Sequence, residues 1–195
     1  MPQNSSNVSA PCPWCTGFDL YRQYHDEEWG KPVYEDDKIF EFLILESFQA
    51  GLSWITILRK RENFRKAFDH FDWNTIANYS EEKMAALAED SGIIRNKLKI
   101  KATVTNAQAF LKVQEEFGSF SKYIWGFVDG KPIDNNPKSL AAVKATTEIS
   151  DKLSKDLKKR GFKFVGSTVV YAHMQATGMV NDHFEDCWRR NTVEI

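Results

Sequence analysis

Cysteine and histidine residues at the two ends of the chain constrain its fold more than any other feature. Cys12 and His25 lie near the N-terminus with twelve residues between them, and His183 and Cys187 lie near the C-terminus with three residues between them. Two thiols and two imidazoles make a complete tetrahedral ligand set for Zn2+, with no position left open for a substrate. If these four residues bind one ion, the ends of the chain must meet, and the metal has a structural role.

The N-terminal half of this set is ambiguous, because Cys15 follows Cys12 in the sequence CPWC. Either cysteine fits a zinc ligand, and the C-x2-C spacing also occurs in redox pairs, although these normally need a βαβ context that the sequence does not predict. The cysteines and histidines also fit ordinary unligated positions. At the other end, the spacing of four between His183 and Cys187 predicts that both side chains face the same way on one helical turn.

Length and composition indicate a globular protein with one substantial domain or two small lobes. With 195 residues, 42% of them hydrophobic and 27% charged, the chain can form a sizeable core. The longest apolar runs, such as Phe42–Leu45 and Val165–Val170, are too short to cross a membrane, and the N-terminus lacks the pattern of a signal peptide. Three cysteines are an odd number, which argues against a disulfide framework. We therefore expect a cytoplasmic protein with no membrane partner.

The net charge of −1 excludes a uniformly basic surface, but the positive charge is unevenly distributed. Of the 26 lysine and arginine residues, 15 fall in the segments Arg59–Lys66, Arg95–Lys101 and Lys152–Lys163, which contain two acidic residues. Such clusters can form a local phosphate-binding face. On charge alone, solvated helix faces balanced by acids elsewhere are the simpler explanation.

Helical periodicity covers most of the chain, and strand patterns are scarce. Residues 1–11 are rich in Ser, Asn and Pro and predict a disordered tail, so we expect a single domain over residues 12–195. Apolar spacing and capping residues predict helices over a stretch from Asp36, Trp54–Phe68, Ser80–Glu89, Arg95–Gln114, Ser150–Arg160 and Thr168–Gly178. The predicted fold class is therefore all-α.

Glu46 lies inside the apolar stretch FLILESFQAGLSW, which predicts a partly buried carboxylate that needs a partner. The same part of the chain contains a set of aromatic residues, namely Trp14, Tyr21, Tyr24, Trp29 and Trp54. Aromatic faces stack on planar bases and attract cationic ones more strongly, and a carboxylate adds an acceptor and a counter-charge. Together they would suit a positively charged purine. Ordinary core packing with a buried salt bridge is the alternative, and from these residues alone the more common one.

A single glycine, Gly92, separates two predicted helices and is followed by a run of basic residues that starts at Arg95. Free backbone N–H groups at the N-terminus of a helix can hold a DNA phosphate. A plain corner between two helices has the same sequence pattern, so this signal is weak alone. The basic segment Lys158–Gly166 ends in a tight turn and lacks the Gly-Lys-Ser/Thr ending of a Walker loop.

Several motifs occur together in the order that is typical of one family. They are YHDEEWG (Tyr24–Gly30), LESFQAGLSWITILRKRENFR (Leu45–Arg65), SGIIRNKLKI (Ser91–Ile100), LSKDLKKRGFKFVGST (Leu153–Thr168) and MVNDHFEDC (Met179–Cys187). From about Cys12 to Cys187 the chain resembles the bacterial 3-methyladenine DNA glycosylase I family, and the blocks AGLSWITIL and KKRGFKFVG are specific to it.

The resemblance implies a helix-hairpin-helix glycosylase fold, in which two helical lobes flank a DNA-facing cleft. The family's hairpin would fall on Ser91–Arg95 and would hold the backbone of damaged duplex DNA. The residues expected to contact DNA are Gly92, Ile93, Ile94, Arg95, Lys97 and Lys163. The chain departs from the wider superfamily here, because it has one hairpin glycine rather than Gly-x-Gly, and the superfamily's usual catalytic aspartate cannot be placed in it.

The resemblance also implies one structural zinc ion, which would join the N- and C-terminal segments. It would fall on Cys12, His25, His183 and Cys187, because the family's C-x12-H spacing selects Cys12 over Cys15.

The family's base pocket would fall on Glu46 and on the aromatic residues Tyr24, Trp54, Tyr21 and Trp14, with Trp29 shaping the wall. Glu46 would accept hydrogen bonds from the exposed edge of adenine and would take an electrostatic part in catalysis.

The implied activity is hydrolysis of the N-glycosidic bond of 3-methyladenine in alkylated double-stranded DNA, with the free base as product. Methylation at N3 makes the base cationic and a good leaving group, so the enzyme needs to extrude the nucleotide, select the base and admit water. No lysine stands out in the pocket motifs, which predicts a monofunctional hydrolase without Schiff-base chemistry. We expect a monomer. Two rival functions are an alkylated-DNA-binding protein that does not cleave, and a zinc hydrolase, which would need an open metal position.

Overall fold

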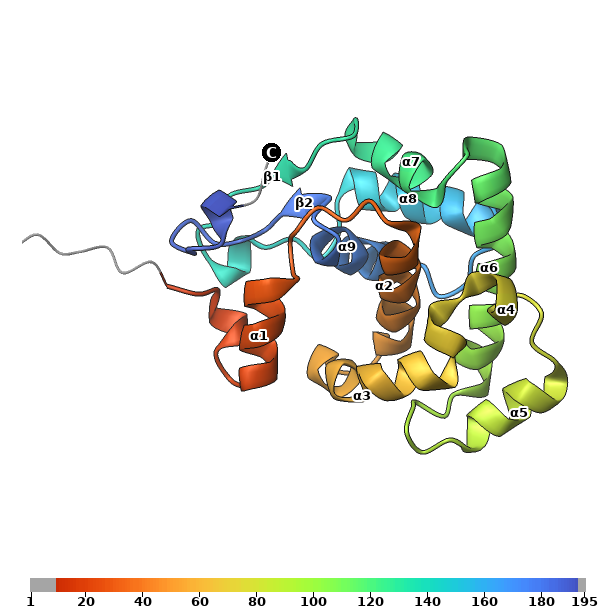
Figure 1. The fold of residues 1–195 in the computed structure, drawn as a ribbon. Helices are drawn as coiled ribbons and strands as arrows, with labels where there is room; N and C mark the ends of the chain where they lie inside the picture. The colour runs from red at the N-terminus through yellow and green to blue at the C-terminus, as the bar shows by residue number, and fades with distance from the viewer. Residues whose placement is uncertain (1–9, 193–195) are drawn as a thin grey trace, which may run out of the picture.

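The computed structural model describes residues 10–192, and this part of the chain is mainly helical (Figure 1). Its α-helices are α1 Asp19–Glu27, α2 Asp36–Gln49, α3 Trp54–Ala67, α4 Trp73–Ile76, α5 Glu81–Glu89, α6 Lys97–Phe117, α7 Phe120–Trp125, α8 Glu148–Lys159 and α9 Ser167–Ala176. Short 3-10 turns lie at Pro13–Cys15, Asp69–Phe71, Gly126–Val128, Leu140–Ala142 and Arg190–Thr192. None of these helices is long and apolar enough to span a bilayer.

Helix α2 forms the centre of the core, because its side chains are buried on all sides. Every residue from Ile39 to Phe48 is buried, and α3, α6, α7 and α9 pack around the helix. A helix that is apolar around its circumference is stable only inside a protein. At its start, Asp36 accepts hydrogen bonds from the backbone N–H groups of Phe120 and Ser121, which begin α7 (2.9 and 2.7 Å). These hydrogen bonds fix the position of α2 along its axis, and they therefore also fix how deeply Glu46 lies in the protein.

Most predicted helix boundaries lie within a few residues of the observed ones, and capping residues explain the differences. Ser80 caps α5 as expected, by accepting a hydrogen bond from a backbone N–H of its first turn. Helix α6 begins at Lys97 rather than at Arg95, because the side chain of Asn96 caps it. It then continues past the predicted end until Gly118, whose φ of 83° suits glycine and terminates the helix.

The two ends of the described chain lie side by side, together with α1, and α4, α5 and α6 lie at the opposite end of the molecule (Figure 1). The N–H of Ala10 donates to the carbonyl of Asp186 (3.1 Å), and the N–H of Trp188 donates to the carbonyl of Ala10 (3.3 Å). Residues 1–9 of the predicted disordered tail lie outside the described residues. Ala10, within the predicted tail, is paired with the C-terminal segment in this way.

A short parallel strand pair interrupts the helical architecture. Strand β1 (Ile133–Asp134) pairs with β2 (Val180–Asn181), and β2 leads directly into the segment that carries the C-terminal cysteine and histidine. From His183 to Cys187 this segment is an irregular loop with a turn, so the predicted helical turn is wrong. Cys187 instead forms a bridge with Ala10, and this long-range pairing overrides a spacing that also suits a helix.

Candidate active site and metal centre

One cavity of about 260 Å³ collects all the aromatic residues and the carboxylate that the sequence singles out. Its walls come from the turn at Pro13–Cys15, from α1, α2, α3 and α9, and from two loops. The lining residues are Trp14, Tyr21, Tyr24, Trp29, Glu46, Gln49, Trp54, Leu140, Val143, Ala172, Gln175, Asp182 and Phe184. A cavity with mostly apolar walls and few polar groups is the usual form of a small-molecule site.

Glu46 enters this cavity from the buried helix α2 with one carboxyl oxygen unpartnered. Its side chain is 4% exposed, and Oε2 has no hydrogen-bond partner in the described chain. Burial raises the pKa of this carboxyl to about 8, because the low-dielectric surroundings disfavour the charged form. Buried polar atoms are normally paired. An unpaired carboxyl in a cavity therefore indicates a site for a ligand that supplies hydrogen bonds or positive charge.

Two further polar atoms in the cavity wall are also buried without a good hydrogen bond. The hydroxyl of Tyr24 and the indole N–H of Trp54 approach each other without reaching good hydrogen-bond geometry, and neither has another partner among residues 10–192. The rings of these residues are 5.6 Å apart and inclined at 51°. Burial, and then the nearby charge of Glu46, raise the pKa of Tyr24 well above its ordinary value, so its hydroxyl keeps its proton. The wall thus offers two donors beside one acceptor.

Tyr21 and Trp14 shape the cavity in different ways. The Tyr21 hydroxyl accepts a hydrogen bond from the backbone N–H of Ile55 (2.9 Å), in the first turn of α3. This bond joins α1 to α3 and holds Trp54 in place, so the ring of Tyr21 lines the cavity while its hydroxyl is occupied. Trp14 packs edge-on against Tyr21 and Trp29, with ring centroids 5.7 and 5.0 Å away.

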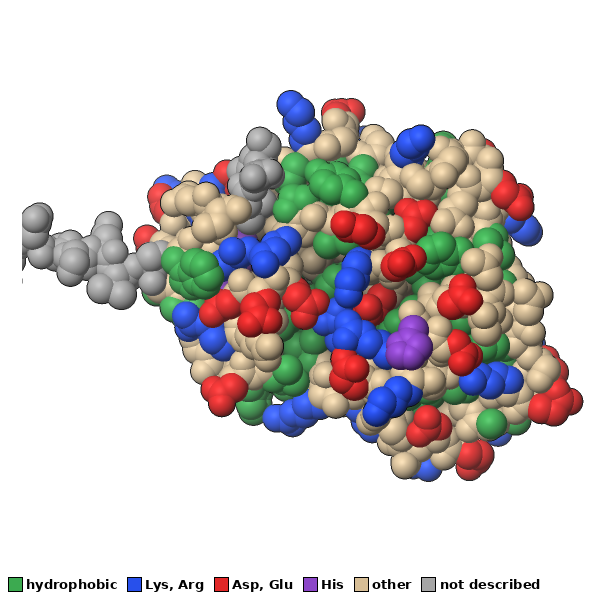
Figure 2. All heavy atoms as spheres, in the orientation of Figure 1, with side chains coloured by type: hydrophobic (Ala, Val, Ile, Leu, Met, Phe, Trp, Pro, Cys, Tyr) green, Lys and Arg blue, Asp and Glu red, His purple; other side chains and the backbone are tan. Residues whose placement is uncertain are grey.

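Behind the cavity, an ion-pair network links three of the helices that form its walls, α1, α2 and α3. Arg61 on α3 donates to Glu41 on α2 (2.6 Å) and to Glu28, which follows α1 (2.7 Å). Arg65 also pairs with Glu41 (2.7 Å). Arg61 and Arg65 of the basic segment Arg59–Lys66 thus hold the helices together, so these two charges do not contribute to a phosphate-binding face. On the face in Figure 2, acidic and basic side chains are likewise interspersed.

Cys12, His25, His183 and Cys187 form a compact buried cluster beside the cavity. Their four ligand atoms all lie within 4.8 Å of one another. The sulfur–nitrogen distances are 3.6 Å from Cys12 to His183, 3.4 Å from Cys187 to His25 and 3.6 Å from Cys187 to His183. In a tetrahedral zinc site with Zn–S of about 2.3 Å and Zn–N of about 2.0 Å, sulfur and nitrogen are separated by about 3.5 Å. The cluster therefore has the dimensions of a four-coordinate metal site.

The second nitrogen of each imidazole has a partner that orients the ring toward the cluster. Nδ1 of His25 donates to Asp26 (2.7 Å), and Nε2 of His183 donates to the carbonyl of Trp29 (3.2 Å). Such outer contacts fix the tautomer that leaves the other nitrogen free to bind a metal. Gly30 lies against the same imidazole: its φ is +77°, and a Cβ there would come 2.8 Å from Nε2 of His183.

The thiol chemistry also fits a metal, and it separates the two candidate N-terminal cysteines. A hydrogen bond with Cys12 is the main cause of a strongly lowered pKa at Cys187, and the same bond raises the pKa of Cys12. Two thiols thus compete for one proton, and a bound dication would remove that competition. Cys15 lies outside the cluster, because its thiol donates to the carbonyl of Cys12 (3.0 Å).

The hairpin between α5 and α6 is tied to α3, which also carries a cavity wall. Lys60 donates to the carbonyls of Ser91 and Gly92 (2.9 and 3.2 Å), and the N–H of Gly92 donates to Asp90 (2.7 Å). At the start of α6 the side chain of Asn96 accepts hydrogen bonds from the backbone N–H groups of Leu98 and Lys99, so these two groups are not free.

The expected DNA contacts differ in exposure. Arg95, Lys97 and Lys163 are exposed, Gly92 and Ile94 are half-buried, and Ile93 is buried in the core. Lys99 links the start of α6 to two other segments. It donates to the carbonyl of Ala50 (2.7 Å), in the turn before α3, and lies 6.0 Å from the ring of Phe164, which adjoins Lys163.

Several lining residues were not predicted from the sequence. Gln49 lies one turn beyond Glu46 on α2 and could have been found from helical spacing. Gln175, Asp182 and Phe184 come from the last quarter of the chain, and Leu140 comes from a loop in which it is 64% exposed. Asp182 precedes the metal-site residue His183, and nothing in the local sequence shows that it turns into the cavity.

Comparison with known proteins agrees with this geometry. Residues 14–190 match the family model of methyladenine glycosylase. The chain is 48% identical over 180 residues to the DNA-3-methyladenine glycosylase of Haemophilus influenzae, covering 92% of this chain and 97% of that protein. It is 47% identical over 176 residues to DNA-3-methyladenine glycosylase 1 of Escherichia coli, covering 90% and 94% of the two chains.

Solved structures extend the similarity to the fold. A crystal structure of a 3-methyladenine DNA glycosylase I matches with a TM-score of 0.89 at 47% identity, over 92% of this chain and 98% of that one. A structure of the Staphylococcus aureus enzyme that describes 3-methyladenine recognition matches with a TM-score of 0.90 at 36% identity, over 93% and 97% of the chains. The sequence, the fold and the cavity agree, and the chain belongs to the methyladenine glycosylase family.

Proposed function

We propose that the protein hydrolyses the N-glycosidic bond of 3-methyladenine in alkylated double-stranded DNA and releases the free base. The observation that carries the proposal is the cavity in which an unpaired buried carboxyl, Glu46, lies among aromatic walls. Its relatives in Haemophilus influenzae and Escherichia coli are DNA-3-methyladenine glycosylases. A matching 3-methyladenine DNA glycosylase I variant has a crystal structure in complex with 3-methyladenine.

Glu46 is the proposed catalytic and selecting group. With a pKa of about 8 it carries a proton at neutral pH before a base binds, because burial disfavours its charge and no ion pair of the described residues compensates it. A cationic base brings the missing positive charge and favours the ionised carboxylate, whereas a neutral adenine does not. Glu46 then accepts hydrogen bonds from the edge of the base, and Tyr24 and Trp54 stack beside it. Since methylated adenine leaves as a neutral molecule, the enzyme does not need to protonate it.

The aromatic residues Tyr21, Trp14 and Trp29 complete the proposed base site by closing its walls. DNA would be held on the side where the hairpin and the loop at Lys163 meet the turn before α3. The proposed contacts are the exposed Arg95, Lys97 and Lys163 and the backbone of the hairpin at Gly92, Ile93 and Ile94. The side chain of Ile93 is buried, so its contribution to DNA binding is through its backbone.

We assign zinc as the metal of the four-residue cluster. Two thiols and two imidazoles at the observed spacing are the donor set that zinc prefers. Its role would be structural, because Cys12, His25, His183 and Cys187 fill all four positions. It would join α1, with Tyr21 and Tyr24, to the segment that carries Asp182. Cobalt substitution would test this role: a tetrahedral spectrum that does not change with substrate supports it, and a spectrum that responds to substrate favours the zinc-hydrolase alternative.

Release of free bases from methylated duplex DNA tests the proposed activity, with chromatographic identification of each base. We expect free 3-methyladenine from the wild-type protein and a large loss of release from Glu46→Gln. Absence of release by folded, zinc-loaded wild-type protein would refute the activity and favour a non-cleaving damage-binding protein.

A monomeric state and a cytoplasmic location stay predictions. Light scattering measures the first, and cell fractionation measures the second.

A further inference from the structure

Lys99, in the first turn of α6, is a buried lysine that has no carboxylate partner. The residue is 6% exposed, and burial lowers the pKa of its ammonium group. Among residues 10–192, the lysines that pair with a carboxylate are Lys38 and Lys83, so Lys99 has no counter-charge there. Removing an ammonium group from water is costly unless hydrogen bonds and opposite charge compensate it. The acceptors that Lys99 does have are therefore informative.

These acceptors are two backbone carbonyls at the C-terminal end of α2. Nζ donates to the carbonyl of Phe48 (2.9 Å) and to that of Ala50 (2.7 Å), which is the C-cap of the helix. The last carbonyls of a helix have no intrahelical partner, and they carry partial negative charge. Lys99 thus compensates the end of α2, and the ring of Phe164 lies 6.0 Å from Nζ.

The end of α2 leads into the turn of residues 50–53, and the base cavity is built on both sides of this turn. Glu46 lies one helical turn before it, and Trp54 directly follows it. Both residues have other supports, because α2 is buried on all sides and the hydroxyl of Tyr21 accepts a hydrogen bond from the first turn of α3. Lys99 is therefore not needed to shape the cavity. It determines where the cavity lies relative to α6 and to the hairpin before α6.

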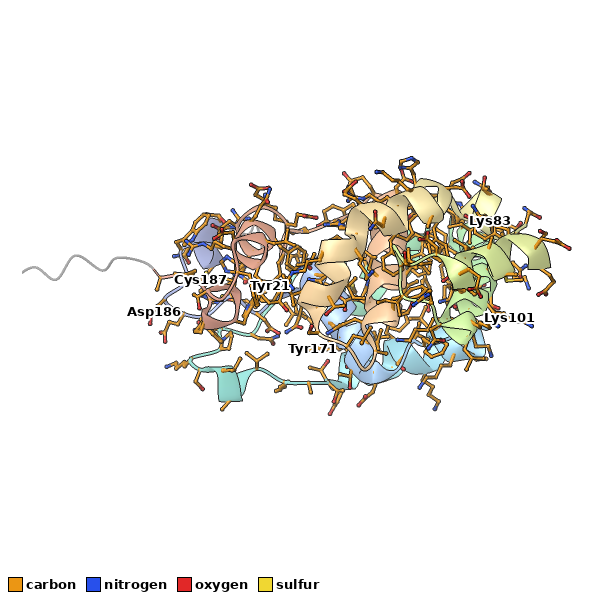
Figure 3. All side chains as sticks on the ribbon, turned by 90° about the horizontal axis from the view of Figure 1, so that it is seen from below. Tyr21, Lys83, Lys101, Tyr171, Asp186 and Cys187 are labelled. Atoms are coloured by element: carbon orange, nitrogen blue, oxygen red, sulfur yellow. The ribbon has the colours of Figure 1, made fainter. Side chains whose placement is uncertain are left out.

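A second lysine links the same two parts of the molecule in the opposite direction. Lys60, on α3, donates to two carbonyls of the hairpin between α5 and α6 (2.9 and 3.2 Å). The parts are separate in space, since Lys101, near the start of α6, and Tyr21, in the cavity wall, lie well apart (Figure 3). Lys60 and Lys99 thus join the hairpin, which is the expected DNA anchor, to the helices of the base cavity at two points.

We infer that Lys99 is a positioning residue for the proposed glycosylase reaction, on which this inference rests. It fixes the cavity relative to the hairpin, so that duplex DNA held on the hairpin presents the extruded nucleotide to Glu46 and Trp54. Extrusion breaks base stacking and pairing, and a nucleotide that is displaced by about 1 Å can react about 100-fold more slowly. Without the hydrogen bonds of Lys99, fewer bound duplexes hold the base in the cavity, although the cavity itself still binds a free base.

The variant Lys99→Met tests this role, because it keeps the length of the side chain and removes the ammonium donor. In zinc-loaded protein, single-turnover release of 3-methyladenine from methylated duplex DNA gives the maximum rate and the protein concentration at half of that rate. Quenching of tryptophan fluorescence by free 3-methyladenine gives the base affinity. We expect the maximum rate to fall about 10- to 100-fold, with the half-saturating concentration and the base affinity within about threefold of wild type. A maximum rate near that of wild type would overturn the inference.

A fluorescent duplex separates positioning from a general loss of structure. The fluorescence of 2-aminopurine beside an abasic-site analogue increases when the neighbouring nucleotide leaves the stack, and no cleavage is involved. Wild-type protein should produce this increase, and Lys99→Met should produce less of it at saturating protein. An equal increase, or a loss of base affinity and melting temperature in parallel with the rate, would identify Lys99 as a structural residue and overturn the inference.

Lys112→Met is the matched control, because Lys112 is an exposed lysine on the same helix. It should equal wild type in all of these measurements, and the same loss in this variant would contradict a specific role of Lys99. Wild-type release of 3-methyladenine verifies the activity itself. Its absence would refute the proposed function, whereas a normal wild-type rate with an unaffected Lys99→Met would refute only the role of Lys99, so the two failures are distinguishable.

Discussion

The buried carboxyl of Glu46 gives the fold a pH dependence that can be measured without DNA. Its pKa is about 8 in the folded protein because of burial, against an ordinary value of 4.5. The unfolded chain therefore loses this proton at lower pH than the folded chain does. The corresponding stabilisation is fully present below pH 4.5 and is lost as the pH rises toward 8. At 1.36 kcal/mol for each pH unit, the loss amounts to at most about 5 kcal/mol.

Replacement of Glu46 by glutamine removes the charge but keeps the shape, so this loss should disappear. For a chain of this size, about 1 kcal/mol changes the melting temperature by about 2–4 °C. We expect Glu46→Gln to melt close to wild type at pH 5 and up to about 10–20 °C higher at pH 9, in thermal melts followed by circular dichroism. Glu81→Gln, at an exposed position on α5, is the control and should follow wild type at every pH. A difference between Glu46→Gln and wild type that stays constant from pH 5 to pH 9 would refute the reasoning.

Three further predictions concern the metal cluster and the hairpin. Gly30→Ala should weaken metal retention in a chelator competition, because a Cβ would come 2.8 Å from a ligand imidazole. Gly130→Ala is the control: Gly130 has a similar φ of +76° but no atom near its added Cβ, so this variant should retain the metal. Cys12→Ser should destabilise the protein by more than about 4 kcal/mol through loss of the metal. Cys15→Ser should destabilise it by less than about 1 kcal/mol, since the serine hydroxyl can still donate to the carbonyl of Cys12. Equal effects of the two variants in denaturant titrations would contradict the assignment of ligands. Arg95→Ala should reduce the salt dependence of DNA binding by about one phosphate contact, and an unchanged slope would exclude Arg95 from the interface.

The sequence predicts those parts of the site that depend on residue type and spacing within short segments. Glu46 stands out because a carboxylate inside an apolar helix is costly, and the ligands stand out because cysteine and histidine are rare and chemically distinctive. The choice of Cys12 over Cys15 came from the family resemblance. Its physical reason is visible only in the structure, where the Cys15 thiol turns toward a backbone carbonyl.

Features that depend on long-range pairing were not predictable in this way. A spacing of four from His183 to Cys187 fits a helix, but pairing with Ala10 selects a loop. Asp182 is an ordinary aspartate in the sequence, and the donors of its hydrogen bonds lie up to 47 residues away. The Tyr21 hydroxyl accepts a hydrogen bond from the backbone N–H of Ile55, 34 positions along the chain, and no local sequence pattern predicts this contact.

The separation of the cluster along the chain has a consequence for synthesis. Cys12 and His183 are 171 positions apart, and Asp182 and Phe184 complete the cavity from the same late segment. A nascent chain emerges from the ribosome N-terminus first, so α1 to α9 can pack while the last wall of the cavity is still missing. Base binding therefore requires translation through residues Asp182–Cys187. A chain that ends before Asp182 keeps most of its core but lacks two residues of the metal cluster and two residues of the cavity wall.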